Sequence, residues 1–459
     1  MPAEGKTIAR DFTEGSVFKK LVSFAFPLFL ANLLQMVYNI VDAAVVGNVM
    51  GEVGLSGVAI GGDIMSFLTF VAVGFAEAGQ IIISQNIGAG HNNEAKRLFT
   101  NMCTLLFGLA VLITLVATVF CGWLLNVMNT PQEAWQQAYA YTFTCALGTL
   151  FVYGYNAIGS MLRGLGNSKG PLFFVGVSTV VNLVLDVLFV VVWRWEAFGA
   201  ALATVISQGV SFALGLVYLV RMREEMPFRV AWKDFRFESE YIGKIVKLGI
   251  PMVIRHTAVQ ASMLFVSSWI NSYGVVVSAV AGIGKKINMV AALSANNLHT
   301  AGSSMIGQNI GAKKYKRVPQ VMLYTFAIAV SFALIFSALM FFIPEKVFGL
   351  MTNDYAAIES VAMQFVPITY LIFLGVAIRA PMNSIINGGG NYKINLLVAI
   401  LDGVVMRVGL SLLFGLACHM EYMGFWLGDS LAGFTPLLIG GVYYLSGGWK
   451  QTKNLVKSE

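Results

Sequence analysis

Two acidic residues lie deep inside apolar runs of this sequence. Asp42 stands in the stretch YNIVDAAVVG and Asp186 in NLVLDVLF. Asn182 precedes Asp186 by four residues, so a helix would place both side chains on one face. Two carboxylates with amide and hydroxyl oxygens from neighbouring helices form a hard oxygen site, which suits Na⁺ or a proton taken up by a buried carboxyl. No base lies near either acid in the sequence, which makes a simple ion pair the weaker interpretation.

Four other acids fall inside apolar runs, where an ionised side chain costs about 3 kcal/mol on insertion scales. They are Asp63, Glu77, Asp402 and Asp429. Asp429 lies close to the end of the last run, so a position at the membrane surface explains it as well as a buried one does. For Asp402 we expect an ion pair with Arg407 or Arg379, since both bases lie in the same half of the chain.

The second half of the chain carries five bases within its apolar runs: Arg255, Lys285, Lys286, Arg379 and Arg407. The adjacent lysines point about 100° apart on a helix, so at least one should face a cavity or another bundle. Both lie well inside their run, which argues against their reaching the membrane surface.

The composition indicates what kind of element positions these residues. Of 459 residues, 57% are hydrophobic and only 12% are charged, and the mean hydropathy is +0.74. A soluble domain is about one-quarter charged, so the chain is expected to cross a membrane several times. The runs are long and continuous, which predicts helices rather than the alternating strands of a β-barrel.

We count twelve apolar runs long enough to span a bilayer as helices. They cover residues 21–48, 55–85, 98–126, 135–161, 171–193, 199–221, 247–271, 276–307, 320–343, 357–387, 394–416 and 423–446.

The distribution of basic residues predicts the orientation. With the N-terminus in the cytoplasm, twenty-three of the 30 Lys and Arg fall in cytoplasmic segments, and only Arg194 and Lys346 fall outside. This excess is the positive-inside pattern, with both termini cytoplasmic. It accounts for the net charge of +7, so binding to nucleic acid is not needed to explain it.

The sequence contains an internal repeat. SQNIGAG at 84–90 returns as GQNIGAK at 307–313, and GNSK at 166–169 returns as GNYK at 390–393. Pro27 and Pro251 stand at nearly the same offset, at the start of each half's first run. Three landmarks in one order indicate duplication. The expected domains are an N-terminal six-helix bundle at 1–220, a cytoplasmic linker at 221–246 and a C-terminal six-helix bundle at 247–459.

Six runs separate equivalent points, so the two halves share one orientation and are related by an axis along the membrane normal. Transporters of this type bind ligands between or within their bundles and work by rocking one bundle against the other. The halves are not chemically equal, because Val266 and Leu410 occupy the positions that correspond to Asp42 and Asp186.

The sequence resembles the multidrug and toxic compound extrusion (MATE) family. The likeness spans about residues 15–450 and lies in PLFLANLLQMVYNIVDAAVVGN, SQNIGAG, GSMLRGLGNSKGP, NLVLDVLF and YYLSGGWK. The resemblance implies secondary active export driven by H⁺ or Na⁺, with substrates that are organic and cationic or amphiphilic. It also implies small-molecule substrates, a prokaryotic inner membrane, no cofactor besides the coupling ion, and a functional monomer.

The family's cation site in related members implies a matching set here. Its members by motif are Asp42, Asn182, Asp186, Thr204 and Asn156, of which the first four would hold Na⁺ if sodium is the coupling ion. Candidates for the substrate cleft are Tyr38, Glu77, Lys285, Lys286, Arg255 and Asp402. Glu77 and the paired lysines depart from the family's usual residues, which leaves the charge preference for substrates open.

Three other kinds of function compete with an exporter. A flippase for lipid-linked precursors shares the architecture, and the bases of the second half would then bind phosphate. A membrane enzyme would need converging catalytic groups, and we find no such set. A scaffold without transport would have no need of buried carboxylates.

Overall fold

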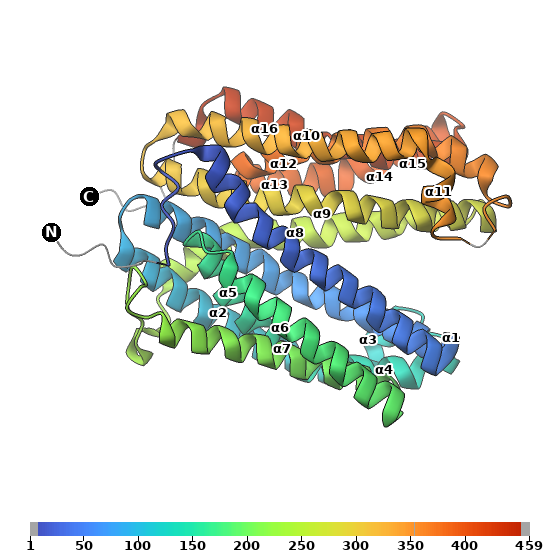
Figure 1. Ribbon diagram of the computed structural model, residues 1–459, viewed down its shortest axis with the longest axis horizontal. Helices are drawn as coiled ribbons and strands as arrows, with labels where there is room; N and C mark the ends of the chain where they lie inside the picture. Colours follow the sequence, from blue (N-terminus) through green and yellow to red (C-terminus); the bar gives the residue numbers. More distant parts are fainter. Residues whose placement is uncertain (1–7, 353, 451–459) are drawn as a thin grey trace. The chain divides into compact units, whose positions relative to one another are not determined.

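The computed structural model describes residues 8–352 and 354–450. Every regular element in these ranges is a helix (Figure 1), in agreement with the predicted fold class. The first half contains α1 (Val17–Gly88), α2 (Asn92–Val119), α3 (Cys121–Val127), α4 (Gln132–Leu147), α5 (Thr149–Gly164), α6 (Lys169–Asp186), η1 (Val187–Val192), α7 (Glu196–Arg221) and η2 (Trp232–Asp234). The second half contains α8 (Ser239–Asn271), α9 (Val275–Gly311), η3 (Tyr315–Arg317), α10 (Val318–Phe342), α11 (Pro344–Gly349), α12 (Glu359–Gly388), α13 (Tyr392–Ile400), η4 (Leu401–Met406), α14 (Arg407–Leu412), η5 (Leu413–Ala417), α15 (Glu421–Ala432), α16 (Thr435–Leu445) and η6 (Gly448–Lys450).

Nine helical stretches of the described chain are long and apolar enough to cross a membrane, and a bent pair, α4 with α5, makes ten. The α1 stretch contains two of the predicted spans, because Gly51 breaks it with φ of 66° and ψ of −161°. Only glycine adopts such a backbone without strain. The α8 helix, which covers the predicted span 247–271, is not among the nine.

Several predicted spans contain breaks that the hydropathy pattern does not reveal. The α4 and α5 helices meet at Gly148 with a bend of 50°. The predicted span 394–416 is built from α13, η4, α14 and η5, in which two π-helical turns interrupt the α-helix. A π turn appears mostly as a local insertion and often at functional sites.

The chain divides into two compact units, each with its own core. Among the described residues, unit 1 contains 8–10 and 26–249, and unit 2 contains 11–25, 250–352 and 354–450. Residues 11–25 therefore belong with the second half, and the linker with the start of α8 belongs with the first. The two halves therefore exchange equivalent segments, because residues 235–249 are the counterpart of residues 11–25 in the internal repeat. Both crossing points lie beside Pro27 and Pro251.

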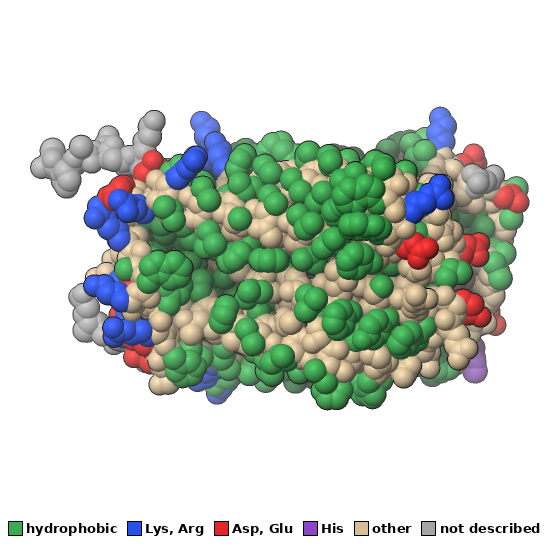
Figure 2. Space-filling view, turned by 90° about the horizontal axis from the view of Figure 1, so that it is seen from below, with side chains coloured by type: hydrophobic (Ala, Val, Ile, Leu, Met, Phe, Trp, Pro, Cys, Tyr) green, Lys and Arg blue, Asp and Glu red, His purple; other side chains and the backbone are tan. Residues whose placement is uncertain are grey.

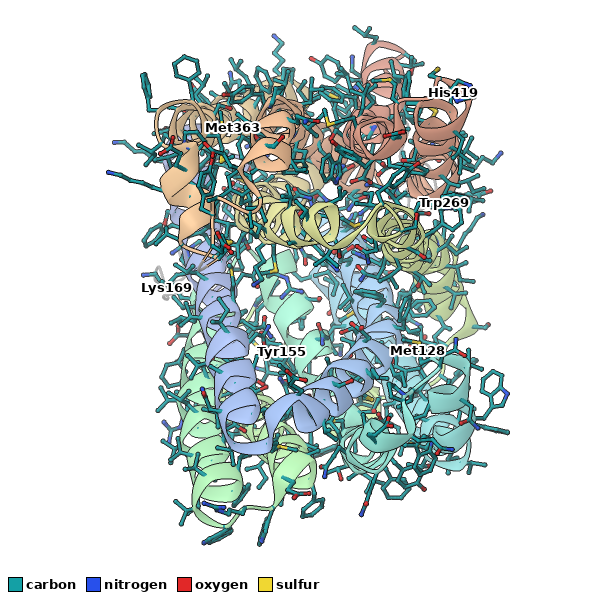
Figure 3. The ribbon with its side chains drawn as sticks, turned by 90° about the vertical axis from the view of Figure 1, so that its right-hand side faces the viewer. Met128, Tyr155, Lys169, Trp269, Met363 and His419 are labelled. Atoms are coloured by element: carbon teal, nitrogen blue, oxygen red, sulfur yellow. The ribbon has the colours of Figure 1, made fainter. Side chains whose placement is uncertain are left out.

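In unit 1, α7 packs against α4, α5 and α6, and α2 packs against α4 and α5. The second part of α1 lies against α4, where a Cβ on Gly61 would come within 2.7 Å of the Tyr141 ring. Tyr153 on α5 donates to the backbone oxygen of Leu68 at 2.7 Å. These contacts bring the middle of α1 close to the helices that carry the other predicted site residues. Figure 3 draws the side chains of the structure as sticks, with Tyr155 of α5 among those labelled.

In unit 2, α12 packs against α9, α10, α15 and α16, and α14 packs against α15. The repeated motif has a structural role in this unit. Gln308 Oε1 accepts from the backbone N of Phe12 at 3.0 Å, and Asn309 Nδ2 donates to Phe12 O at 3.2 Å. The motif near the end of α9 therefore binds the segment that enters from the N-terminus.

Hydrophobic side chains cover much of the face shown in Figure 2, while Lys and Arg gather mainly toward one end of it. Exposed apolar side chains on α2 include Phe107, Leu112 and Leu115, each more than half exposed. A soluble protein rarely exposes such a surface, whereas a lipid bilayer covers it.

Candidate functional site

The carboxyl groups of Asp42 and Asp186 meet inside unit 1. Asp186 is the last residue of α6 and is fully buried, and Asp42 lies in the first part of α1, toward the break at Gly51. The two groups are within hydrogen-bonding reach of one another. An ionised carboxylate only accepts hydrogen bonds, so this contact requires one proton on the pair, or a cation between the oxygens.

Asn182 and Thr204 complete the surroundings of Asp186. With its amide oriented to satisfy both neighbours, Asn182 donates from Nδ2 to Asp186 Oδ2 at 2.9 Å and accepts from the backbone N of Thr204 at 3.3 Å. Tyr38, one turn before Asp42, shares a side-chain hydrogen bond with Thr204. The structure thus brings together five of the residues selected from the sequence, from α1, α6 and α7.

Two oxygens of this group have no partner within the protein. Asp42 Oδ1 and Asp186 Oδ1 are both buried without a hydrogen bond. Among the described residues, neither acid forms an ion pair with a Lys, Arg or His side chain. An uncompensated carboxylate in a protein interior is costly, so the pair favours neutralisation by a proton or a small cation. The donor set of carboxylate, amide and hydroxyl oxygens fits a hard cation such as Na⁺.

Two residues of α4 belong to the same environment and were not selected from the sequence. Tyr141 and Cys145 interact electrostatically with Asp42, and each shares a hydrogen bond with the other. Their spacing of four residues places both side chains on one face of α4, and this spacing is the only feature of the sequence that could have linked them. Asn156, by contrast, donates from Nδ2 to Val152 O of its own helix at 2.8 Å.

A π-helical turn, η1, starts directly after Asp186. Such a turn inserts one residue into the helix and changes the direction of the side chains that follow. Asp186 therefore stands at the last regular α-helical position, opposite Thr204 on α7.

Unit 2 contains a buried charge network. Arg407 Nη2 lies 3.6 Å from Asp402 Oδ1, and Arg407 Nη1 donates to Asp429 Oδ1. Arg407 is 3% exposed. The η4 turn explains the first pair, because its i to i+5 hydrogen-bonding pattern brings residues five apart onto one face. This is the ion pair that we expected for Asp402. Asp429 is a second acid bound to Arg407; from the sequence alone, it could have been placed either at the membrane surface or inside the protein.

Arg255 takes part in a separate polar group of unit 2. Its Nη1 donates to Asn387 Oδ1 at 3.3 Å, and Asn387 Nδ2 lies 2.9 Å from His299 Nε2. All three side chains are buried. His299 and Asn387 come from α9 and α12, and their place beside Arg255 could not be read from the sequence because helix pairing decides it.

The other candidates for the substrate cleft lie elsewhere. Glu77 is half-buried and interacts electrostatically with Arg163, which donates from Nε to Gln80 Oε1 at 2.8 Å. Lys285 and Lys286 are both exposed on α9. The structure therefore does not assemble the cleft candidates into one site within either unit.

Comparison with known proteins identifies the family. The MatE family model matches residues 27–188 and 251–413, which together make up most of the chain. The chain belongs to the MatE family. The two matched stretches of MatE begin at Pro27 and Pro251, so the family model finds the same duplication as the sequence motifs.

Curated relatives agree with this assignment. Probable multidrug resistance protein YpnP of Bacillus subtilis is 34% identical over 310 residues, which cover 68% of this chain and 69% of that protein. Probable multidrug resistance protein YoeA of the same organism is 25% identical over 459 residues and covers 98% of each chain. The resemblance to the MATE family is thereby confirmed, and the chain is a multi-pass membrane transporter, not an enzyme.

Two solved structures share the fold of this MatE protein. A MOP superfamily transporter from Pyrococcus furiosus, in which a binding pocket of reverse polarity suggests a different function, aligns with a TM-score of 0.87 at 22% identity over 99% of this chain and 100% of that chain. An outward-facing multidrug resistance MATE family transporter aligns with a TM-score of 0.88 at 21% identity, again over 99% and 100%. Both alignments cover the two units in full.

Proposed function

We propose that this MatE protein exports organic compounds, cationic or amphiphilic, in exchange for H⁺ or Na⁺. The observation that carries the proposal is the Asp42–Asp186 pair, in which each acid has one buried oxygen without a partner in the protein. The relatives named as multidrug resistance proteins support the substrate class. We further propose a monomer in the inner membrane of a prokaryote, with both termini in the cytoplasm, because the basic residues follow the positive-inside pattern.

The pair provides a means of coupling. Two ionised carboxylates in contact repel each other and are poorly solvated, whereas one proton or one Na⁺ relieves both costs. Binding of the cation therefore favours the arrangement of α1, α6 and α7 in which the two acids meet. If the empty pair favours a different arrangement, the cation shifts the population between them, and the substrate is released in one of the two.

The test uses purified protein in liposomes with a pH gradient or a Na⁺ gradient imposed alone. Replacement of either acid, D42N or D186N, should abolish gradient-driven transport of a fluorescent organic cation. An amide carries no charge, so it takes up no proton at neutral pH and binds Na⁺ more weakly than a carboxylate does. Asp63 offers a matched control, since it is an exposed acid on the same stretch of α1, and D63N should keep transport. Normal transport in both D42N and D186N would refute the proposal.

A second candidate, transfer of a lipid-linked headgroup, is favoured by one observation. Arg255, Arg379 and Arg407 of unit 2 are buried or half-buried. Within the described part of the chain, Arg407 alone among them forms ion pairs, with its two acids. A guanidinium group can bind phosphate through two parallel hydrogen bonds. A flippase would rescue a strain that lacks an envelope-lipid flippase and would confer no tolerance to drugs, whereas the proposed exporter should do the reverse.

A further inference from the structure

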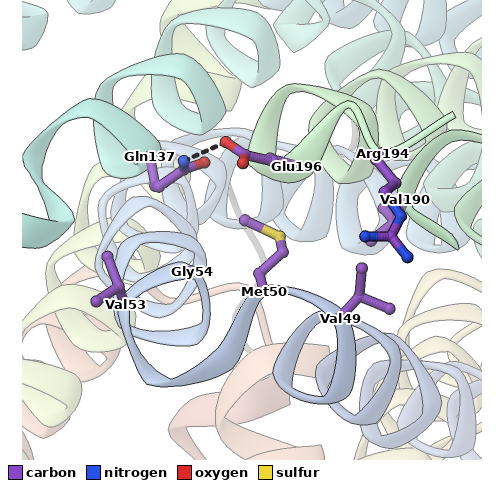
Figure 4. A pocket seen from close by; sticks show the side chains of 8 residues that line it. All are labelled: Val49, Met50, Val53, Gly54, Gln137, Val190, Arg194 and Glu196. Atoms are coloured by element: carbon purple, nitrogen blue, oxygen red, sulfur yellow. Dashed lines mark hydrogen bonds between the residues drawn. The ribbon is translucent and has the colours of Figure 1, made fainter.

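A cavity of about 300 Å³ lies in unit 1 at the end of the bundle away from the linker. Figure 4 shows its lining, which comes from α1, α4, η1 and the start of α7. The lining residues are Val49, Met50, Val53, Gly54, Gln137, Val190, Arg194 and Glu196. Neither the MatE assignment nor the proposed site accounts for this cavity.

The cavity lies on the same helices as the carboxyl pair. On α1, Asp42 is followed at four-residue steps by Val46 and then by Met50 of the cavity. After α6, Val190 lies within the π-helical turn η1, and Arg194 follows the end of η1 outside any helix. On α1, four residues of helix rise about 6 Å, so Asp42 leads through Val46 to the cavity, while Val190 lines the cavity directly.

The two valines form an apolar layer between the cavity and the acids. Val46 and Val190 are fully buried and belong to one hydrophobic cluster with Tyr141 and Cys145, which also neighbour Asp42. Met50 packs against the same cluster. An apolar constriction of this kind excludes water and ions until it widens.

The mouth of the cavity carries two opposite charges held by a rigid turn. Gln137 Nε2 donates to Glu196 Oε2 at 2.5 Å (Figure 4). Gln137 Oε1 also accepts from Ala197 N at 3.2 Å. Arg194 and Glu196 both have positive φ, of 54° and 52°, which non-glycine residues adopt only when their surroundings hold them. The flanking rings of Trp193 and Trp195 provide such support, with centroids 4.7 Å apart.

Met50 is placed to close the cavity. Its side chain extends into the space drawn in Figure 4 and lies so close to Gly54 that a Cβ there would collide with it. The neighbouring Gly51 breaks the helix. A flexible thioether beside a helix break can change rotamer at low cost.

We propose that this cavity is the outer vestibule through which the coupling cation reaches Asp42 and Asp186. Glu196 raises the local concentration of cations, Arg194 lowers it, and Val46 with Val190 forms the gate. The inference rests on the proposed function and adds an entry route to it. A cavity of this volume lies at the lower limit for drug-sized ligands, and its polar mouth suits a hydrated ion.

The experiment measures the external cation concentration that gives half-maximal exchange in liposomes of low ionic strength. E196Q should raise this concentration, by roughly tenfold, because a charge at the mouth of a low-dielectric site focuses ions. R194Q should lower it. Maximal rates should stay unchanged in both, and both shifts should shrink at high salt. Opposite shifts cannot arise from misfolding, which would impair both variants alike.

Glu133 provides the control, because it is an exposed acid one turn before Gln137 on α4, and E133Q should leave the half-maximal concentration unchanged. A second arm tests the gate: V190T, which keeps the side-chain shape and adds a hydroxyl, should let the coupling cation leak without substrate. The proposal is refuted if E196Q and R194Q shift the half-maximal cation concentration in the same direction. It is also refuted if their shifts are no larger than that of E133Q.

These outcomes are separable from the proposed function. If D42N and D186N abolish coupling while E196Q and R194Q behave like E133Q, the vestibule fails and the antiporter stands. If D42N and D186N transport normally, the antiporter itself fails.

Discussion

Equivalent helices of the two units differ at the place where unit 1 holds its carboxyl pair. At the repeat offset, Asp186 corresponds to Leu410 and Thr204 to Gly428. In unit 1 the Asp186 carboxyl and the Asn182 amide fill the space beside Thr204. In unit 2 the helix backbones approach so closely that a Cβ on Gly428 would collide with the backbone N of Ser411. Room for a polar site therefore exists in unit 1 alone at this position.

The charges of the two units also differ in what they can do. Asp402 and Asp429 share Arg407, so their charges are compensated inside the protein. Asp42 and Asp186 have only each other and neutral groups. A compensated charge holds helices together, whereas an uncompensated one responds to protons or cations. In the proposed mechanism, the charges of unit 2 therefore hold its helices together, whereas the carboxyl pair of unit 1 couples transport to the cation.

The largest predicted effect comes from breaking the ion pairs that Arg407 forms with Asp402 and Asp429 in unit 2. R407M should remove the ion-pair partner of the buried Asp402 and the half-buried Asp429, leaving only the longer-range charge of Arg379. It should lower the free energy of unfolding by about 3–5 kcal/mol. Thermal unfolding in detergent measures this loss, with K286M as a control at an exposed base of the same unit. Replacing both acids as well, D402N with D429N, should restore part of the stability. A melting temperature of R407M equal to that of K286M contradicts the network.

The close approach of helices in unit 2 gives a smaller prediction. G428A should lower the free energy of unfolding by about 1–3 kcal/mol, because the added methyl group meets backbone rather than a movable side chain. Gly409 on α14 serves as the control, since a Cβ at that position would meet nothing within 4 Å, and G409A should be neutral or stabilising. If G428A and G409A have the same melting temperature, the inference that the helices approach more closely in unit 2 than in unit 1 is wrong.

The smallest prediction compares the acids Glu238 and Glu14, which stand at equivalent positions before the first helix of each half. A hydrogen bond from Arg97 lowers the pKa of Glu238 below its ordinary 4.5, and this outweighs partial desolvation. Because the folded-state pKa is depressed, the stabilisation is complete above pH 4.5 and is lost as the pH falls through the folded value. Glu14 is 73% exposed beside Lys314, so its ion pair contributes little.

Melting temperatures from neutral pH down to about pH 3 test this comparison, a range that spans the titration of Glu238. E238Q should reduce stability slightly at neutral pH and should remove part of the loss that the unchanged protein suffers below pH 4.5. E14Q should leave the profile as it is. If the melting temperature of E238Q falls with pH in the same way as that of the unchanged protein, the Arg97–Glu238 contact does not cause the loss of stability in acid.

The helical fold could be predicted because its signals are local. A span needs a run of apolar side chains, and the runs in this chain are long and separated by basic loops. The duplication was visible in short motifs and in Pro27 and Pro251. The breaks at Gly51, Gly148 and the π turns were not visible, because hydropathy averages over them and the packing against neighbouring helices decides where a helix bends.

The candidate site was predictable in its members but not in its contacts. Burial cost singles out Asp42 and Asp186 in any helical membrane protein, and the spacing of Asn182 follows from the helical period. The sequence by itself thus determined the spans, the duplication, and the position at which the halves differ chemically. Only the tertiary structure decided that Thr204 and Tyr38 join the pair, that Arg407 holds two acids, and that residues 11–25 belong to unit 2. Those outcomes depend on how helices rotate and pair, which is set by contacts between segments far apart in the chain.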